Sequence, residues 1–226
     1  MHPRKSNRSR LTFGARLSAA VILVLSGLWV AAPSWALGPV DGEFGLLWWS
    51  NDFSVDVREG GTEGGAFGGH SEAWWDDTWG LKGSLYRSDL DDTGLEGIDH
   101  FSVDVKRRLF SLTDNSFLAV GLGWEDIDLE DGTDSSSARL LLEGRVGVLG
   151  TLYLYGQTAW FPSLDDAGQR TDLNGNEYEA GLSYDPFPFL SLRAGYRRFK
   201  LDFDDDTGSG ISTETRGFTF GAGLHW

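Results

Sequence analysis

One short segment of the chain carries the residue types of a hydrolytic enzyme. His100, Ser102 and Asp104 are separated from one another by single apolar residues. In an extended strand, side chains two positions apart lie on one face with their backbones about 6.5 Å apart, so neighbours can touch. A serine nucleophile needs a base within hydrogen-bond reach and a third group that orients the base. The spacing therefore admits an acyl hydrolase with Ser102 as nucleophile and His100 as base.

Two acidic segments have the oxygen atoms that Ca²⁺ and Mg²⁺ prefer as ligands. Their acids are Asp126, Asp128, Glu130, Asp131 and Asp134 in the first segment, and Asp202, Asp204, Asp205 and Asp206 in the second. Neither segment has the full spacing of an EF-hand loop, and the sequence D-L-N-G-N at 172–176 lacks it as well. A solvated, repulsive surface or adaptation to a saline habitat explains the same acids, so weak cation binding remains one interpretation among these.

The elements that must position these residues are strands of period two. From Thr78 onward, eight segments of about ten residues alternate apolar with small or polar residues. One of them has Leu118, Val120, Leu122 and Trp124 on one side and Ala119, Gly121, Gly123 and Glu125 on the other. Ten residues cross a bilayer at a tilt, so the pattern predicts transmembrane strands with one face toward lipid.

The connections between these segments alternate in length. Short connections are predicted at 112–116, 149–151 and 185–188, and longer acidic ones at 89–99, 126–137, 162–176 and 202–214. Short periplasmic turns and longer extracellular loops are typical of outer-membrane barrels, so we predict an all-β, antiparallel up-and-down transmembrane barrel.

The region before Thr78 decides the number of strands. A strand at Glu43–Ser50 that continues toward Val57, a glycine-rich connection at Gly60–Gly69 and a weak strand at Ala66–Trp75 give ten strands in all. The alternative is an eight-stranded barrel in which residues 60–75 form one irregular loop.

The chain ends on an amphipathic strand. Phe218, Phe220, Leu224 and Trp226 share one face, and the last residue is aromatic. This strand resembles the C-terminal signature of Gram-negative outer-membrane barrels, and the resemblance implies recognition by the barrel-assembly machinery.

The first 36 residues are predicted to be a secretory signal peptide. Five basic residues precede an apolar run at 17–32, and Ser34 and Ala36 are small residues at the positions that a signal peptidase requires. Residues 37–226 then form the barrel domain, with 14 basic against 34 acidic residues and a net charge of −20. Such a charge disfavours nucleic-acid binding, and the chain has no cysteine for a disulfide or a thiolate site.

Strand parity places ten charged side chains inside the barrel. They are Lys82, Asp104, Lys106, Arg108, Glu143, Arg145, Glu177, Glu179, Arg193 and Arg197. A barrel of eight to ten strands leaves little more than the space of its own side chains, so these charges are predicted to pair and plug the lumen. A narrow channel with Arg193 and Arg197 as the selectivity element remains the other interpretation. The same parity turns Ser102 and His100 into the lumen, away from a lipid substrate.

Three segments carry a resemblance to a family. The runs L-Y-G-Q-T-A-W-F-P-S from Leu154, N-E-Y-E-A-G-L-S-Y from Asn176 and S-L-R-A-G-Y-R-R-F from Ser191 resemble the YfaZ-type outer-membrane proteins, and more broadly the small barrels of the OmpA and OmpX kind. The resemblance covers about the last 75 residues. It departs from the family at Trp226, where these proteins usually end in Phe. It implies an exported barrel and little about activity.

We therefore expect an integral outer-membrane protein of a Gram-negative envelope, structural or weakly pore-forming (porin-like), without an enzymatic step, cofactor or metal site. Its expected partners are outer-membrane lipid and lipopolysaccharide, the assembly machinery, and weakly bound divalent cations at the acidic loops. The alternatives are a lipid A-modifying hydrolase that uses Ser102 and His100, and a soluble periplasmic barrel that binds an apolar ligand.

Overall fold

The structure is a computed structural model that describes most of the chain after the predicted signal peptide. The described residues are 40–55, 58–75, 77–89, 98–113, 116–129, 133–165, 171–204 and 207–226. The predicted signal peptide, residues 1–36, lies outside the described residues.

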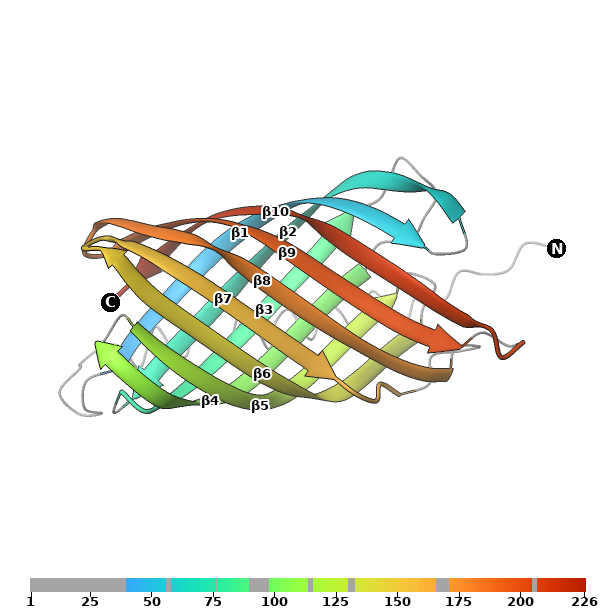
Figure 1. Ribbon diagram of the computed structural model, residues 1–226, viewed down its shortest axis with the longest axis horizontal. Helices are drawn as coiled ribbons and strands as arrows, with labels where there is room; N and C mark the ends of the chain where they lie inside the picture. The colour runs from blue at the N-terminus through green and yellow to red at the C-terminus, as the bar shows by residue number, and fades with distance from the viewer. Residues whose placement is uncertain are drawn as a thin grey trace, which may run out of the picture. The chain divides into compact units, whose positions relative to one another are not determined.

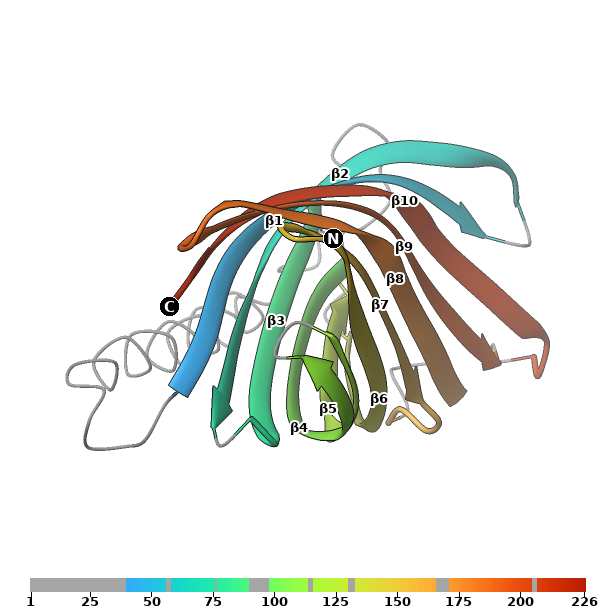
Figure 2. The same ribbon diagram turned by 60° about the vertical axis from the view of Figure 1, so that its left-hand side comes forward.

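Ten antiparallel strands form a closed barrel in which each strand is hydrogen-bonded to its neighbours in the chain. Figures 1 and 2 show the strands side by side and tilted around the barrel. The strands are β1 (Val40–Val55), β2 (Arg58–Trp75), β3 (Trp79–Asp89), β4 (Ile98–Thr113), β5 (Ser116–Leu129), β6 (Thr133–Leu149), β7 (Leu152–Phe161), β8 (Thr171–Phe187), β9 (Leu190–Asp204) and β10 (Gly210–His225).

The first and last strands close the barrel. Phe44 lies opposite Leu224 and Trp48 opposite Phe220. Beyond the last paired residue, the amide of Gly42 donates to the carbonyl of Trp226 at 3.2 Å, and the Trp226 amide donates back at 3.1 Å. The prediction of ten strands is confirmed, and the eight-stranded alternative is wrong.

Several predicted connections belong to strands instead. Residues 60–69 lie within β2, where glycine supplies no side chain from which a period of two could be recognised. The acidic loops are also shorter than predicted: β5 continues to Leu129 and β6 begins at Thr133. Likewise, β9 continues to Asp204, and β10 begins at Gly210. These strand ends extend past the apolar part of the wall, where the outward positions are polar and apolar residues such as Ile127 and Leu201 are buried on the inner face. The alternation is therefore reversed there, and the apolar outer face that marks the strands elsewhere is missing.

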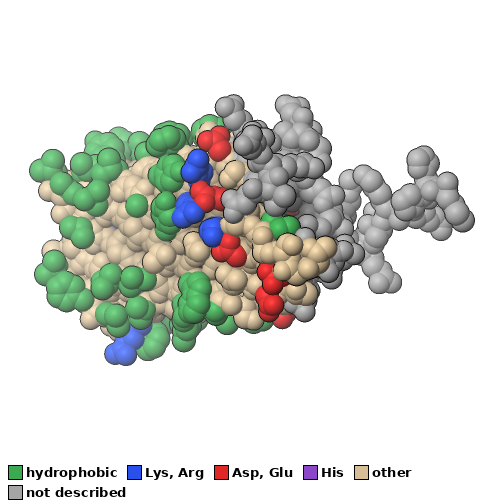
Figure 3. Space-filling view, turned by 45° about the vertical axis from the view of Figure 1, so that its right-hand side comes forward, with side chains coloured by type: hydrophobic (Ala, Val, Ile, Leu, Met, Phe, Trp, Pro, Cys, Tyr) green, Lys and Arg blue, Asp and Glu red, His purple; other side chains and the backbone are tan. Residues whose placement is uncertain are grey.

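The outer face of the wall is apolar. Leu122 is 68% exposed, Phe218 is 61% exposed and Trp48 is 49% exposed, although all three are large hydrophobic residues. Figure 3 shows hydrophobic side chains spread over one part of this surface, with a group of Lys, Arg, Asp and Glu side chains beside it. In a barrel that spans a membrane, such an apolar surface is covered by lipid. No helix in the described part of the chain is long and apolar enough to cross a membrane.

Candidate functional site

The lumen of the barrel is the candidate site, and it has three layers along its axis. The end of the barrel at which β1 begins and β10 ends is called the terminal end here, and the opposite end is called the loop end. A cavity occupies the terminal end, buried ion pairs fill the centre, and apolar side chains fill the loop end. Only the first two layers are lined by the charges that strand parity predicts.

The central layer is a set of five charged residues, called the central belt: Asp104, Glu125, Arg139, Glu177 and Arg197. Each of them is at most 2% exposed. Arg139 contacts Glu125, donates to Glu177 at 3.0 Å, and has its Nε 3.3 Å from Asp104 Oδ1. Arg197 donates to Glu177 at 2.8 Å. Buried charges persist in a protein when they are paired and hydrogen-bonded, which is the arrangement in this layer.

Aromatic rings complete the central belt on the side of β3 and β4. The guanidinium carbon of Arg197 lies 3.5 Å from the centre of the Tyr86 ring, and its NH2 lies 3.3 Å from His100 Nδ1. Tyr86 and His100 are stacked with their ring centres 5.8 Å apart. A cation over a ring face is attracted by the ring's electrons, so Tyr86 stabilises the Arg197 guanidinium in addition to Glu177.

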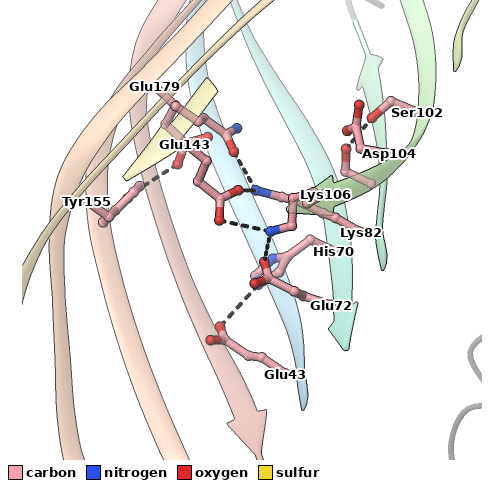
Figure 4. A network of polar contacts seen from close by, with 12 residues as sticks. Glu43, His70, Glu72, Lys82, Ser102, Asp104, Lys106, Glu143, Tyr155 and Glu179 are labelled. Atoms are coloured by element: carbon pink, nitrogen blue, oxygen red, sulfur yellow. Dashed lines mark hydrogen bonds and ion pairs between the residues drawn. The ribbon is translucent and has the colours of Figure 1, made fainter. Parts of the chain in front are cut away.

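A second ion-pair network lies between the central belt and the terminal end (Figure 4). Lys82 and Lys106 both donate to Glu143, at 2.6 Å and 2.9 Å. Lys106 also lies 3.0 Å from Glu72. On the opposite side of this network, Tyr155 donates to Glu179 at 2.8 Å. The network joins β2, β3, β4 and β6, so it ties together strands that are not all neighbours.

The cavity at the terminal end has a volume of about 570 Å³. It extends from Tyr86 in the interior to Pro188 and Trp226 at the rim. Within it, Glu43 accepts from Arg193 at 2.7 Å and lies 3.1 Å from His70 Nε2. This cavity is called the terminal vestibule below.

The loop end of the lumen is filled by apolar side chains. The cluster consists of Trp49, Ala66, Ile127, Phe161, Leu164, Leu173, Phe199 and Leu201, with Phe203 packed against it. Leu164 comes from the segment after β7, where its amide donates to the carbonyl of Leu173 at 2.8 Å. The next amide, that of Asp165, donates to the carbonyl of Ser136 at 3.0 Å. Segment 162–165 therefore closes over the apolar cluster, which blocks the lumen above the central belt.

The structure places all ten sequence-predicted charges on the inner face. Seven are buried, and Arg108, Arg145 and Arg193 are half-buried beside the terminal vestibule. Five charged partners were not among the ten: Glu43, Glu72, Glu125, Arg139 and Asp185. The parity of Glu143 extends back to Arg139, which lies just after the connection predicted at 126–137 and was not counted among the ten. Asp185 was assigned to a turn, whereas it lies within β8 and pairs with Arg145 at 2.9 Å.

His100 and Ser102 do not form a catalytic pair. Ser102 Oγ lies 2.7 Å from Ser84 Oγ, and His100 contacts Glu125 and Arg197. No hydrogen bond joins His100 to Ser102 within the described residues. Both side chains are at most 5% exposed inside the lumen. The hydroxyl therefore lacks the hydrogen-bonded base that nucleophilic attack requires.

The acidic segments form no metal site within the part of the chain that the structure describes. Glu130, Asp131, Asp205 and Asp206 lie outside it. Asp202, beyond the apolar band, pairs with Lys200 at 2.8 Å. Partial burial raises the pKa of Asp202, but hydrogen bonds from Lys200 and Ser212 outweigh it and leave the pKa below its usual value. This carboxylate already has a cationic partner. In the C-terminal strand, Phe218, Phe220, Leu224 and Trp226 lie exposed on the outer face.

Comparison with known proteins identifies the fold. No protein-family model and no curated protein matches the sequence. Among solved structures, the outer-membrane protease OmpT from Escherichia coli superposes with a TM-score of 0.54 and 11% identity over 83% of this chain and 96% of that chain. Neisserial surface protein A matches at 10% identity and a TM-score of 0.43, over 83% of this chain and 99% of that chain. Ail of Yersinia pestis matches at 15% identity and a TM-score of 0.36, over 84% of this chain and 100% of that chain. The chain thus has the fold of outer-membrane β-barrels, and at these identities the likeness extends no further than fold.

Proposed function

We propose that this protein is a non-enzymatic, structural component of a Gram-negative outer membrane whose barrel is closed to solutes. The observation that carries the proposal is the central belt: five charged side chains, each at most 2% exposed, pair with one another inside the lumen. The apolar cluster and segment 162–165 close the same lumen at the loop end. Two successive obstructions favour the predicted plug over the predicted channel.

A narrow channel would need free charged groups along its path. Arg197, one of the two residues predicted as a selectivity element, is held between Glu177, His100 and Tyr86. Arg193, the other, is paired with Glu43 at the terminal end. Opening a path would separate buried ion pairs and expose apolar side chains, and both changes are costly.

The outer face and the chain ends support the membrane location. The exposed apolar wall of large side chains is suited to lipid and is out of place on a soluble periplasmic barrel. The predicted signal peptide and the C-terminal strand with Trp226 agree with export and with recognition by the assembly machinery. The YfaZ-type resemblance is compatible with this role. Contact with lipopolysaccharide follows from the location, because that lipid forms the outer leaflet around such barrels.

The test is single-channel conductance of the refolded protein in planar bilayers. Folding is verified first by heat-dependent mobility on a gel, and an open porin in the same bilayers shows that steps would be detected. A folded protein that gives no steps supports a closed structural barrel. Discrete, reproducible steps from the unaltered protein would refute closure and restore the channel interpretation.

A further inference from the structure

We propose that the terminal vestibule binds a small ligand that joins one oxoacid group, a carboxylate or a phosphate, to an aromatic body, with Arg108 as the anion-binding residue. The inference is independent of whether the barrel conducts, because the vestibule lies on the terminal side of the central belt. A volume of about 570 Å³ is in the range of small-molecule sites.

Arg108 differs from the other cationic residues of the vestibule wall in having no carboxylate partner. Lys82 is paired with Glu143, Arg145 with Asp185, and Arg193 with Glu43. Among the described residues, Arg108 has no ion pair and no side-chain hydrogen bond. A guanidinium in a sheltered cavity that lacks a counter-ion is poorly compensated, so an incoming anion gains more there than at a paired arginine.

Two aromatic rings hold the guanidinium of Arg108 in place. Its Cζ lies 4.3 Å from the centre of the Trp74 ring and 4.6 Å from the centre of the Phe117 ring. The two rings meet edge to face at 5.4 Å. Stacking against the ring faces holds the planar guanidinium in one orientation. Its N–H groups then match the two oxygens of a carboxylate or phosphate. The aromatic surface beside it suits a ligand with an aromatic body.

The local backbone makes room for this arrangement. Gly80 of β3 lies under Trp74, and a Cβ at that position would come within 2.7 Å of the indole ring. Any larger residue at position 80 would therefore displace Trp74 from Arg108.

Acids limit the charge of the ligand. Glu43, Glu72, Glu143, Glu179 and Asp185 all line the same cavity as Arg108. A ligand with several anionic groups would be repelled by these carboxylates. A ligand with one oxoacid group can place that group at Arg108 and its aromatic body against the neighbouring aromatic rings. The rim with Trp226 and Pro188 opens at the end that carries the chain terminus, which is periplasmic if the outer-membrane arrangement holds. The ligand is then expected from the periplasmic side.

Isothermal titration calorimetry tests the site on the refolded protein in a neutral detergent. The probes are phenyl phosphate, phenol and benzylamine, which share a ring and differ in charge. We expect phenyl phosphate to bind at least tenfold more tightly than the other two, and the Arg108→Gln substitution to weaken its binding at least tenfold.

The adjacent residue supplies the matched control. Arg107 is exposed on the outer face, where its Cζ lies 5.5 Å from the centre of the Trp79 ring. Arg107→Gln removes the same charge from the same strand and should leave the affinity unchanged. Absence of binding by the unaltered protein at millimolar probe would overturn the proposal, as would equal losses in both variants or none in Arg108→Gln.

A second measurement covers the case in which Arg108→Gln does not fold. In an NMR titration of the unaltered protein with phenyl phosphate, the amides of Trp74, Arg108 and Phe117 should shift, and those of Phe199 and Leu201 in the apolar cluster should not. Shifts confined to other parts of the barrel would place the probe elsewhere and reject the site.

Discussion

Arg139 on β6 donates a 3.0 Å hydrogen bond to Glu177 on β8, so the pair passes over β7, which lies between the two strands. Its Nε is also 3.3 Å from Asp104 on β4, on the other side of β5. One guanidinium thereby connects strands that share no backbone hydrogen bond. The central belt therefore cross-links strands through the lumen, in addition to the backbone hydrogen bonds that join neighbouring strands around the wall.

Replacement of Arg139 by Met should destabilise the barrel strongly. The substitution keeps much of the side-chain length but leaves Glu125, Glu177 and Asp104 without their shared cation. Removing one partner of a buried ion pair costs about 3–5 kcal/mol, because the remaining charge is buried without compensation. Urea unfolding of the protein in lipid vesicles measures this free energy of unfolding.

A surface arginine provides the comparison for this prediction. The side chain of Arg216 is 56% exposed and lies 3.5 Å from Glu214. An exposed pair contributes at most about 1 kcal/mol, so Arg216→Met should have a small effect. Similar free energies of unfolding for the two variants would show that the central belt does not stabilise the barrel.

The sequence predicts the wall of the barrel better than its interior. Alternation such as that of Leu118, Val120, Leu122 and Trp124 depends only on neighbours in one strand, and the structure has these four side chains exposed on the outer face. Strand ends are harder to predict, because beyond the lipid the outward positions are polar and the apolar residues, such as Ile127 and Leu201, lie on the inner face instead. The strand position of residues 60–69 was missed because glycine has no side chain from which alternation could be recognised.

The pairing of the inner charges depends on information that no single strand contains. Parity predicts that Arg197 and Glu177 both lie on the inner face of their strands. Their contact, however, depends on the register of β8 against β9 and on barrel closure. The same limit applies to Ser102, whose partner is Ser84 on β3 and not His100 on its own strand. Spacing along a strand therefore suggested a catalytic pair that the cross-strand contacts do not form.

Glycine at position 123 should be essential for the central belt. A Cβ there would lie 2.1 Å from the carbonyl oxygen of Val103 and 2.4 Å from Asp104 Oδ1. The Val103 carbonyl of β4 cannot move away from the added methyl group without breaking the pairing of β4 with β5. Gly123→Ala should therefore lower the free energy of unfolding by about 1–3 kcal/mol or more. Unfolding in urea provides the measurement. Gly147→Ala is the control, because a Cβ there has no neighbour closer than 3.5 Å. A stable Gly123→Ala barrel would show that the close approach is not a constraint.

Ser102→Ala should leave the lipid A of the host unchanged. Ser102 is 1% exposed in the lumen and hydrogen-bonded to Ser84, so it reaches no lipid. Mass spectrometry of lipid A from cells that express the unaltered protein, the variant or neither protein makes the comparison. A lipid A species that appears with the unaltered protein and disappears with the variant would establish the hydrolase alternative.

Phe220→Arg tests whether the outer wall faces lipid. Phe220 is 49% exposed on β10 and stacks on Trp48 of β1 with ring centres 6.1 Å apart. An arginine at the middle of a bilayer costs about 2–4 kcal/mol on the lipid face of a barrel, and about 0–1 kcal/mol near the interface. Ser212→Arg, on the same strand at the loop end beyond the apolar wall, should therefore cost much less.

Urea unfolding in vesicles gives both values. On a water-covered barrel, exposed substitutions cost within about 0.5 kcal/mol wherever they lie. Near-equal, small costs at positions 220 and 212 would therefore contradict a lipid-facing wall, while a difference of about 2 kcal/mol or more would place Phe220 in the bilayer.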